Sequence, residues 1–189
     1  MPIGPVHRGR PRSLVPDSLK HMAFHTADER TVLEGFVDVQ RTEIAALLDG
    51  LTEEQARRRL VPSLTTPLSL VAHATFVEQI WFHHRVAGVP RADLGLPGSV
   101  DESFRLGPDD TIDSVRTAYE TASERSREIA AGHDLDEQFP WHHGPVSLRF
   151  IYGHMIAELA RHAGHGDILV EQLRAEGTRP LPNARAMGS

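Results

Sequence analysis

The 189-residue sequence contains no cysteine, which excludes disulfide bonds, thiolate metal sites, iron–sulfur clusters and a cysteine nucleophile. It has no apolar run of about 18 residues, as a transmembrane helix needs, and residues 1–20 lack the apolar segment of a secretory signal. Lysine is nearly absent, with Lys20 alone beside 19 arginines, and the net charge is −6. Because the longest basic run is residues 57–59, nothing indicates a nucleic-acid groove. These absences predict a cytoplasmic protein that binds neither membranes nor nucleic acids.

The length and composition favour one globular domain. A chain of this size, with 40% hydrophobic and 24% charged residues, is long enough to bury a core of ordinary size. Residues 1–25 are rich in Pro, Gly and Arg and show no hydrophobic periodicity, and residues 178–189 lack it as well. We therefore expect a flexible arm at 1–25, a single domain at 26–177 and a flexible tail at 178–189.

Several short patterns predict where helices begin. Residues 26–29 (Thr-Ala-Asp-Glu) and 52–55 (Thr-Glu-Glu-Gln) both have the capping-box pattern, in which two side chains satisfy free backbone N–H groups. Thr66 and Pro67 combine a capping hydroxyl with a proline at the first helical position, where its missing N–H is tolerated. The acidic pair at 109–110 predicts a further start, because carboxylates favour the positive end of the helix dipole.

These starts, and apolar residues spaced three and four apart, predict four long helices, whereas no run has the alternation of a strand. The helices are expected at 26–48, 66–88, 111–131 and 146–176, with a short helix at 52–60. Residues 91–108 are rich in Gly, Pro, Asp and Ser, so we interpret them as a long loop of the kind that often borders a functional site. The predicted fold class is all-α, a four-helix bundle.

Histidine is the residue in excess, with twelve in the chain. Most of them are expected in the arm, in the loop at 132–145 or at the rim of the second helix: His7, His21, His25, His133, His142, His143, His83 and His84. His73 instead shares the apolar stripe of the second helix. A buried neutral imidazole without partners is destabilising by on the order of 1–3 kcal/mol, so His73 needs a hydrogen-bond partner or a metal ion.

Glu158 and His162 interrupt the apolar stripe of the last helix in the same way. Residues four apart on a helix lie about 6 Å from each other, so this pair could hold one ion together with His73. Two histidines and one carboxylate are the ligands of several catalytic zinc sites and leave a coordination position open. Zinc is the expected metal, with nickel, iron or manganese as alternatives. Taken singly, the same residues also fit a hydrogen-bonded core histidine and an ordinary solvated Glu–His pair.

The same residues belong to a longer pattern. Matching segments lie at 28–30, 61–63, 70–73, 77–82, 147–149 and, most specifically, 154–169 (HMIAELARHAGHGDIL). Over about residues 24–177 the chain resembles the DinB-like superfamily, and within it the actinobacterial branch of mycothiol-dependent transferases and the N-terminal part of maleylpyruvate isomerases. The resemblance implies a DinB/YfiT-like four-helix bundle with a divalent metal on His73, Glu158 and His162. It places His165 and His154 beside these ligands, where either could replace Glu158.

The resemblance also implies an activity. Members of this branch use the metal to bind and deprotonate a low-molecular-weight thiol, here mycothiol, which then attacks an electrophile; this agrees with a chain that has no thiol of its own. The expected function is a metal-dependent S-transferase or isomerase, acting as a monomer or homodimer. A hydrolase that activates water at the same metal and a metal- or ligand-binding bundle without catalysis are the alternatives. We expect Arg149, Arg161 or Arg85 to bind carboxylates of the second substrate, unless they form ordinary surface ion pairs.

Overall fold

The structure is a computed structural model that describes Phe24 and residues 26–177. Its main elements are α2 (Glu29–Ala46), α4 (Pro67–Glu78), the π-helix η1 (Gln79–Val86) that continues α4, α5 (Ile112–Ala131) and α6 (Leu148–Gly177). Shorter elements are α3 (Glu53–Arg57), the 3-10 helix η2 (Asp101–Phe104) and the strands β1 (Gln138–Phe139) and β2 (Val146–Ser147). The all-α prediction is confirmed. None of the described helices is both long enough and apolar enough to cross a membrane.

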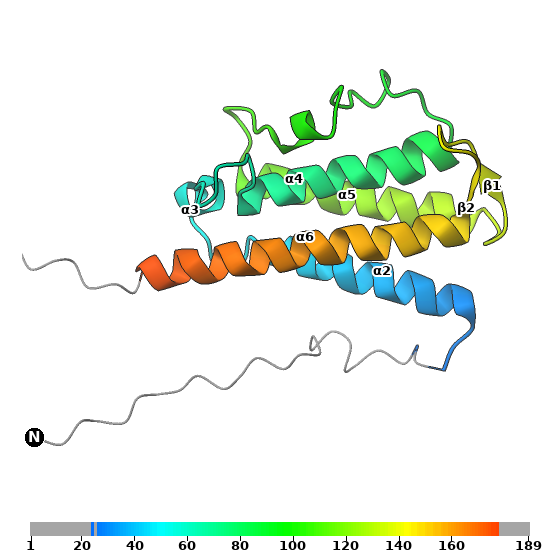
Figure 1. Cartoon of the computed structure of the whole chain (residues 1–189), viewed down its shortest axis with the longest axis horizontal. Coiled ribbons are helices and arrows are strands. Elements are labelled where there is room, and N and C mark those ends of the chain that lie inside the picture. The colour runs from blue at the N-terminus through cyan, green and yellow to red at the C-terminus, as the bar shows by residue number, and fades with distance from the viewer. Residues whose placement is uncertain (1–23, 25, 178–189) are drawn as a thin grey trace, which may run out of the picture.

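The four long helical segments form two packed pairs. α2 lies along α6, and α4 lies along α5 (Figure 1). The long connection between η1 and α5 runs back along the outer side of α4, so α4 and α5 point in the same direction (Figure 1). A bundle with such a crossover connection places one long loop over a helix face. Here that loop carries η2, which packs on α4 beside the candidate site.

The helix starts were predicted in part. Thr52 and Thr66 form the expected caps, each accepting a hydrogen bond from the backbone N–H three residues later. The first helix begins later than predicted, because the Asp28 carboxylate, not the Thr26 hydroxyl, accepts the N–H of the third helical residue. The acidic pair at 109–110 does not cap α5. Thr111 is the cap, and Asp110 Oδ2 instead accepts the backbone N–H of Gly107 in the turn before the helix.

Two short strands, which sequence periodicity did not predict, lie at the end of the bundle opposite α3 (Figure 1). β1 and β2 form an antiparallel pair in which Gln138 lies opposite Ser147 and Phe139 opposite Val146. Two residues per strand are too few to give a readable alternation. Because residues 146–147 belong to this pair, the last helix begins at Leu148 rather than at 146.

The second helix is not a regular α-helix to its end. From Gln79 to Val86 its backbone is π-helical, a form that is rare in proteins but is often found at functional sites. The wider turn changes which side chains face inward. His83 was predicted at the rim, but it is buried and its Nε2–H donates to the Ala122 carbonyl at 3.1 Å, so that prediction is wrong.

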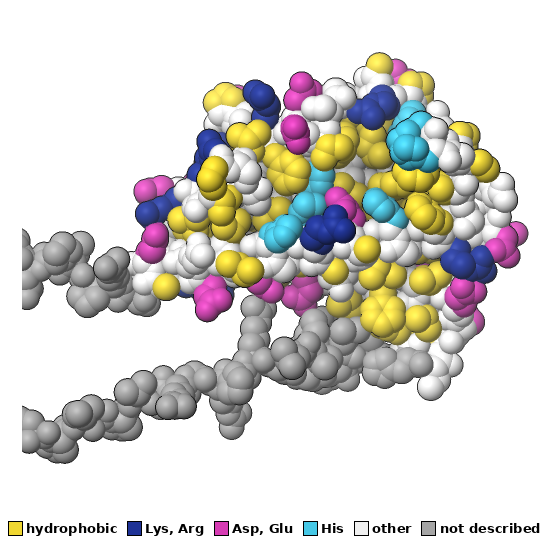
Figure 2. Space-filling view, viewed as in Figure 1, with side chains coloured by type: hydrophobic (Ala, Val, Ile, Leu, Met, Phe, Trp, Pro, Cys, Tyr) yellow, Lys and Arg dark blue, Asp and Glu magenta, His cyan; other side chains and the backbone are white. Residues whose placement is uncertain are grey.

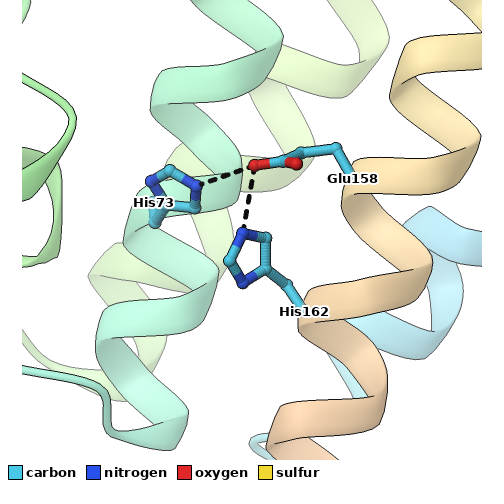
Figure 3. A group of neighbouring side chains, drawn as sticks. All are labelled: His73, Glu158 and His162. Atoms are coloured by element: carbon cyan, nitrogen blue, oxygen red, sulfur yellow. Dashed lines mark hydrogen bonds and ion pairs between the residues drawn. The ribbon is translucent and has the colours of Figure 1, made fainter. Parts of the chain in front are cut away.

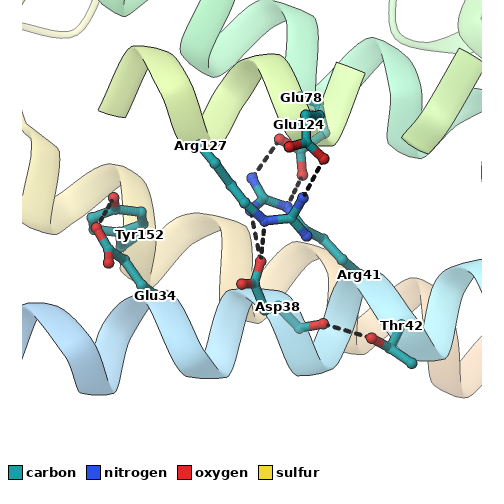
Figure 4. Close-up of polar contacts among 8 residues, drawn as sticks. All are labelled: Glu34, Asp38, Arg41, Thr42, Glu78, Glu124, Arg127 and Tyr152. Carbon is teal, nitrogen blue, oxygen red and sulfur yellow. Dashed lines mark hydrogen bonds and ion pairs between the residues drawn. The ribbon is translucent and has the colours of Figure 1, made fainter. Parts of the chain in front are cut away.

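A buried ion pair links α2 and α4. Arg41 donates from Nε and Nη2 to the two carboxylate oxygens of Glu78, both at 2.8 Å, and from Nη1 to Asp38 at 2.9 Å (Figure 4). Burial alone would lower the pKa of Arg41, but the Glu78 carboxylate raises it above its ordinary value. Arg127 of α5 also donates to Asp38 (Figure 4). This network ties α2, α4 and α5 together.

The predicted tail and, apart from Phe24, the predicted arm lie outside the described residues, and so do His7, His21 and His25. Phe24 is described, and it is buried with its ring centroid 5.3 Å from that of Phe36.

Candidate metal centre

His73, Glu158 and His162 come together at the contact between α4 and α6. Figure 3 shows His73 pointing from α4 toward Glu158 and His162, which stand one turn apart on α6. Glu158 Oε1 lies 3.1 Å from His162 Nε2 and 3.5 Å from His73 Nε2. One ligand atom from each residue lies within 4.8 Å of the others. Two ligands about 2.0–2.2 Å from a shared zinc ion are separated by similar distances.

The orientation of His73 is set by a residue of the long loop. Ser103 of η2 donates its hydroxyl to the Val100 carbonyl at 2.5 Å, so its oxygen accepts the Nδ1–H of His73 at 2.7 Å. This assignment leaves Nε2 of His73 without a proton and directed at Glu158. The ring of Phe104 stacks on the imidazole, with centroids 4.1 Å apart. Metal-binding histidines commonly have their second nitrogen held in this way.

The environment of His73 Nε2 fits a bound cation. The atom is buried and has no hydrogen-bond partner among the described residues. Burial lowers the pKa of His73 more than the neighbouring Glu158 raises it, so the imidazole is neutral at neutral pH. Contact with His162, above all, holds the pKa of Glu158 far below its ordinary value, so it is a carboxylate. A lone pair facing a carboxylate oxygen at 3.5 Å is repulsive unless a cation lies between them, and a donor set of nitrogen and oxygen suits zinc.

The other two histidines of α6 lie beside this group and outside it. His165 is exposed, its ring centroid is 5.8 Å from that of His162, and it lines a separate apolar pocket of about 300 Å³ with Ile168 and Leu169. His154 is half-buried with its ring centroid 4.3 Å from that of Trp81. Burial lowers the pKa of His154 below its ordinary value. Neither belongs to the group of potential ligands in the described residues.

A cavity of about 340 Å³ opens beside the three residues, and this volume suits a small molecule. His73 and Glu158 belong to its wall. The rest of its wall comes from α4, η1, the loops and α6: Phe76, Val77, Ile80, Trp81, Arg85, Arg91, Val100, Trp141, His142 and His154. On this face several histidine side chains lie among apolar, basic and acidic side chains (Figure 2). Glu158 is partly exposed, so reactants can approach it from solvent.

The three arginines predicted to bind substrate occupy different places. Arg85 lines the cavity. Arg161 is exposed and its Nη1 lies 3.5 Å from Glu158 Oε2. Arg149 forms ion pairs with Glu29 and Asp136 and does not line the cavity. The structure thus brings Arg85 and Arg161 to the site and leaves Arg149 at a surface ion pair.

Sequence reasoning missed the site residues that come from loops. Ser103 and Phe104 lie in the segment that composition had marked as a long loop near a site, and Trp141 lies in the loop before β2. Arg91 follows the π-helix. Loop composition predicts that such a segment borders a site, but no spacing rule tells which of its side chains reach the ligands.

The sequence was compared with known proteins. A family model described as "Mycothiol-S-transferase" matches residues 32–175, a range that includes the three clustered residues and the cavity wall. No curated protein matches the sequence.

Proposed function

We propose that this chain, which belongs to the mycothiol S-transferase family, joins the sulfur of mycothiol to a small electrophile at a metal ion held by His73, Glu158 and His162. The observation that carries the proposal is the buried Nε2 of His73, which has no hydrogen-bond partner among the described residues and faces a carboxylate oxygen in the wall of a cavity. Zinc is the metal we expect, because two imidazoles and one carboxylate are the ligands of open catalytic zinc sites.

The chain's own residues prepare the site. Ser103 holds the His73 ring in the tautomer that leaves Nε2 free, and the four-residue spacing on α6 puts Glu158 and His162 side by side. When bound, the metal supplies a positive charge that lowers the pKa of a coordinated thiol, as it does that of water. Because the chain has no cysteine, the thiol must come from a substrate.

The reaction balances without a further reactant. The thiol loses its proton, and its sulfur forms a bond to an electrophilic carbon. A leaving group departs with the bonding electrons, or an activated double bond accepts the electron pair and then takes up a proton. The cavity holds the electrophile next to the thiol, so the two reactants are already in position and need not meet by diffusion.

The test combines metal analysis with turnover. Elemental analysis of zinc-loaded protein should find one metal per chain, and mycothiol-dependent conjugation of chlorodinitrobenzene should accompany it. His162→Ala and Glu158→Gln should lose both while keeping the helical circular dichroism of the unchanged protein. His165→Ala is the matched control on the same helix and should keep the metal, because His165 lies outside the group of ligands.

Each other result has a definite meaning. If His73→Ala and His162→Ala both retain a full equivalent of metal, the proposed ligands are wrong. If the metal binds but ester cleavage proceeds without any thiol, the protein is a hydrolase at the same site. A bound metal with neither activity indicates a binding bundle.

A further inference from the structure

Two arginines of the cavity wall, Arg85 and Arg91, have no acidic partner among the described residues. Arg85 donates from Nη1 to the Pro140 carbonyl at 2.7 Å, and its guanidinium carbon lies 4.4 Å from the centre of the Trp81 ring and 5.9 Å from that of Trp141. Arg91 donates from Nη2 to the Pro97 carbonyl at 2.6 Å. Within the described part of the chain, neither guanidinium is ion-paired with a carboxylate.

This lack of a partner sets them apart from most arginines of the described residues. The following are ion-paired with Asp or Glu: Arg30, Arg41, Arg58, Arg116, Arg125, Arg127, Arg149 and Arg161. The net charge of the chain is negative, so carboxylates are plentiful. Around the cavity, however, Glu158 is the only acidic residue of the described wall, and its Oε1 lies 3.1 Å from His162 Nε2.

Arg85 also has a hydrogen-bonding edge without a partner. Its Nε is buried and makes no hydrogen bond among the described residues. Since Nη1 is occupied by Pro140, the edge formed by Nε and Nη2 is the one left for a ligand. Two parallel N–H groups on one edge of a guanidinium match the two oxygens of a carboxylate. Burial lowers the pKa of Arg85 from its ordinary value, which reflects a charge that has lost water without gaining an anion.

We propose that Arg85, assisted by Arg91, binds a carboxylate of the acceptor substrate. The proposal rests on the transferase function above and specifies its acceptor as a small, carboxylate-bearing electrophile. Mycothiol carries hydroxyl and amide groups but no carboxylate, so the anion belongs to the acceptor. The apolar side chains of the same wall, such as Val77 and Ile80, contact its body. The reactive carbon then lies beside His73 and Glu158, and the carboxylate lies beside Arg85.

The binding test uses the chain's own fluorescence. Its two tryptophans, Trp81 and Trp141, both line the cavity, so a bound nitroaromatic should quench their emission. The probes are para-chloro-meta-nitrobenzoate and its methyl ester, titrated without thiol into zinc-loaded protein. The ratio of acid to ester affinity should fall by about 10-fold or more in Arg85→Gln, because a hydrogen-bonded charge pair is lost. In Arg85→Lys the ratio of acid to ester affinity should lie between those of the unchanged protein and Arg85→Gln, since lysine keeps the charge but lacks the planar guanidinium edge.

A matched control removes a different arginine. Arg125 and Glu128 form an exposed ion pair on α5, and Arg125 does not line the cavity. Arg125→Gln therefore removes the same charge and should leave the ratio of acid to ester affinity unchanged. Circular dichroism checks that each variant is folded. The same two probes, used as acceptors with mycothiol, should show a parallel fall in the ratio of kcat/KM for acid over ester in Arg85→Gln.

The proposal and the function beneath it can fail separately. Acid-selective quenching that depends on Arg85 supports the carboxylate site even if no thiol transfer occurs, in which case the proposed function fails. Equal affinity for acid and ester, or a ratio unchanged in both Arg85→Gln and Arg91→Gln, overturns the carboxylate site. Mycothiol transfer to the ester would then leave the transferase function standing.

Discussion

The hydrogen bond between Ser103 and His73 makes a sharp prediction, because it joins a loop to a proposed metal ligand. Ser103→Ala removes the oxygen that accepts the Nδ1–H of His73 at 2.7 Å. The two side chains are 5% and 2% exposed, so water cannot readily replace the lost partner. The imidazole would keep an unsatisfied buried N–H and could also turn about its side-chain bonds.

The size of the effect follows from these contacts. A buried donor left without its partner is destabilising by about 1–3 kcal/mol. Loss of the group that orients a metal-binding histidine typically lowers metal affinity by about 10- to 100-fold, which equals about 1.4–2.7 kcal/mol of binding free energy. Ser103→Ala should therefore bind zinc about 10- to 100-fold more weakly than the unchanged protein.

The assay is a competition for zinc with a chromophoric chelator at neutral pH. Ser126→Ala is the matched control: Ser126 of α5 is also buried, but its hydroxyl has no hydrogen-bond partner among the described residues and it does not line the cavity. Its zinc affinity should be unchanged. Equal affinity of the Ser103→Ala and Ser126→Ala proteins would refute the idea that Ser103 orients a metal ligand.

Two further predictions concern packing and pH. Gly166→Ala should lower the free energy of unfolding in urea by about 1–3 kcal/mol, because the added Cβ would collide with Leu47 Cδ1. Gly164→Ala should instead raise the free energy of unfolding by up to about 1 kcal/mol, because nothing lies within 4 Å of its added Cβ. Equal effects of the two substitutions would contradict this packing. In metal-free protein, the free energy of unfolding should rise as the pH increases from 5 toward 7, because unfolded His73 binds a proton near its ordinary pKa of 6.5 whereas the buried, lowered-pKa imidazole does not. Urea titrations of His73→Gln should show a smaller rise of the free energy of unfolding with pH. If this free energy depends on pH in the same way in both proteins, the pKa of His73 is not lowered in the folded state.

The local features of this protein could be predicted from its sequence. Helix starts at Thr52 and Thr66 depend on side chains three residues away, so a short pattern contains the whole interaction. The pairing of Glu158 with His162 is equally local, because helical geometry places residues four apart side by side. Even the errors at helix starts were small, since Asp28 and Thr26 compete for the same helix end.

Tertiary structure decided what those local features do. His73 meets the α6 pair only because α4 packs beside α6, and a crossover loop, whose path no periodicity encodes, brings Ser103 to its ring. Arg85, in the π-helical segment, lines the cavity because the fold brings it beside residues that are distant in the chain, such as Trp141 and Glu158. The sequence by itself determined where the long helices lie along the chain and the four-residue spacing of Glu158 and His162, because both arise within a few residues. Which atoms face one another across the cavity was settled by long-range packing, where residues far apart in the chain share one buried space.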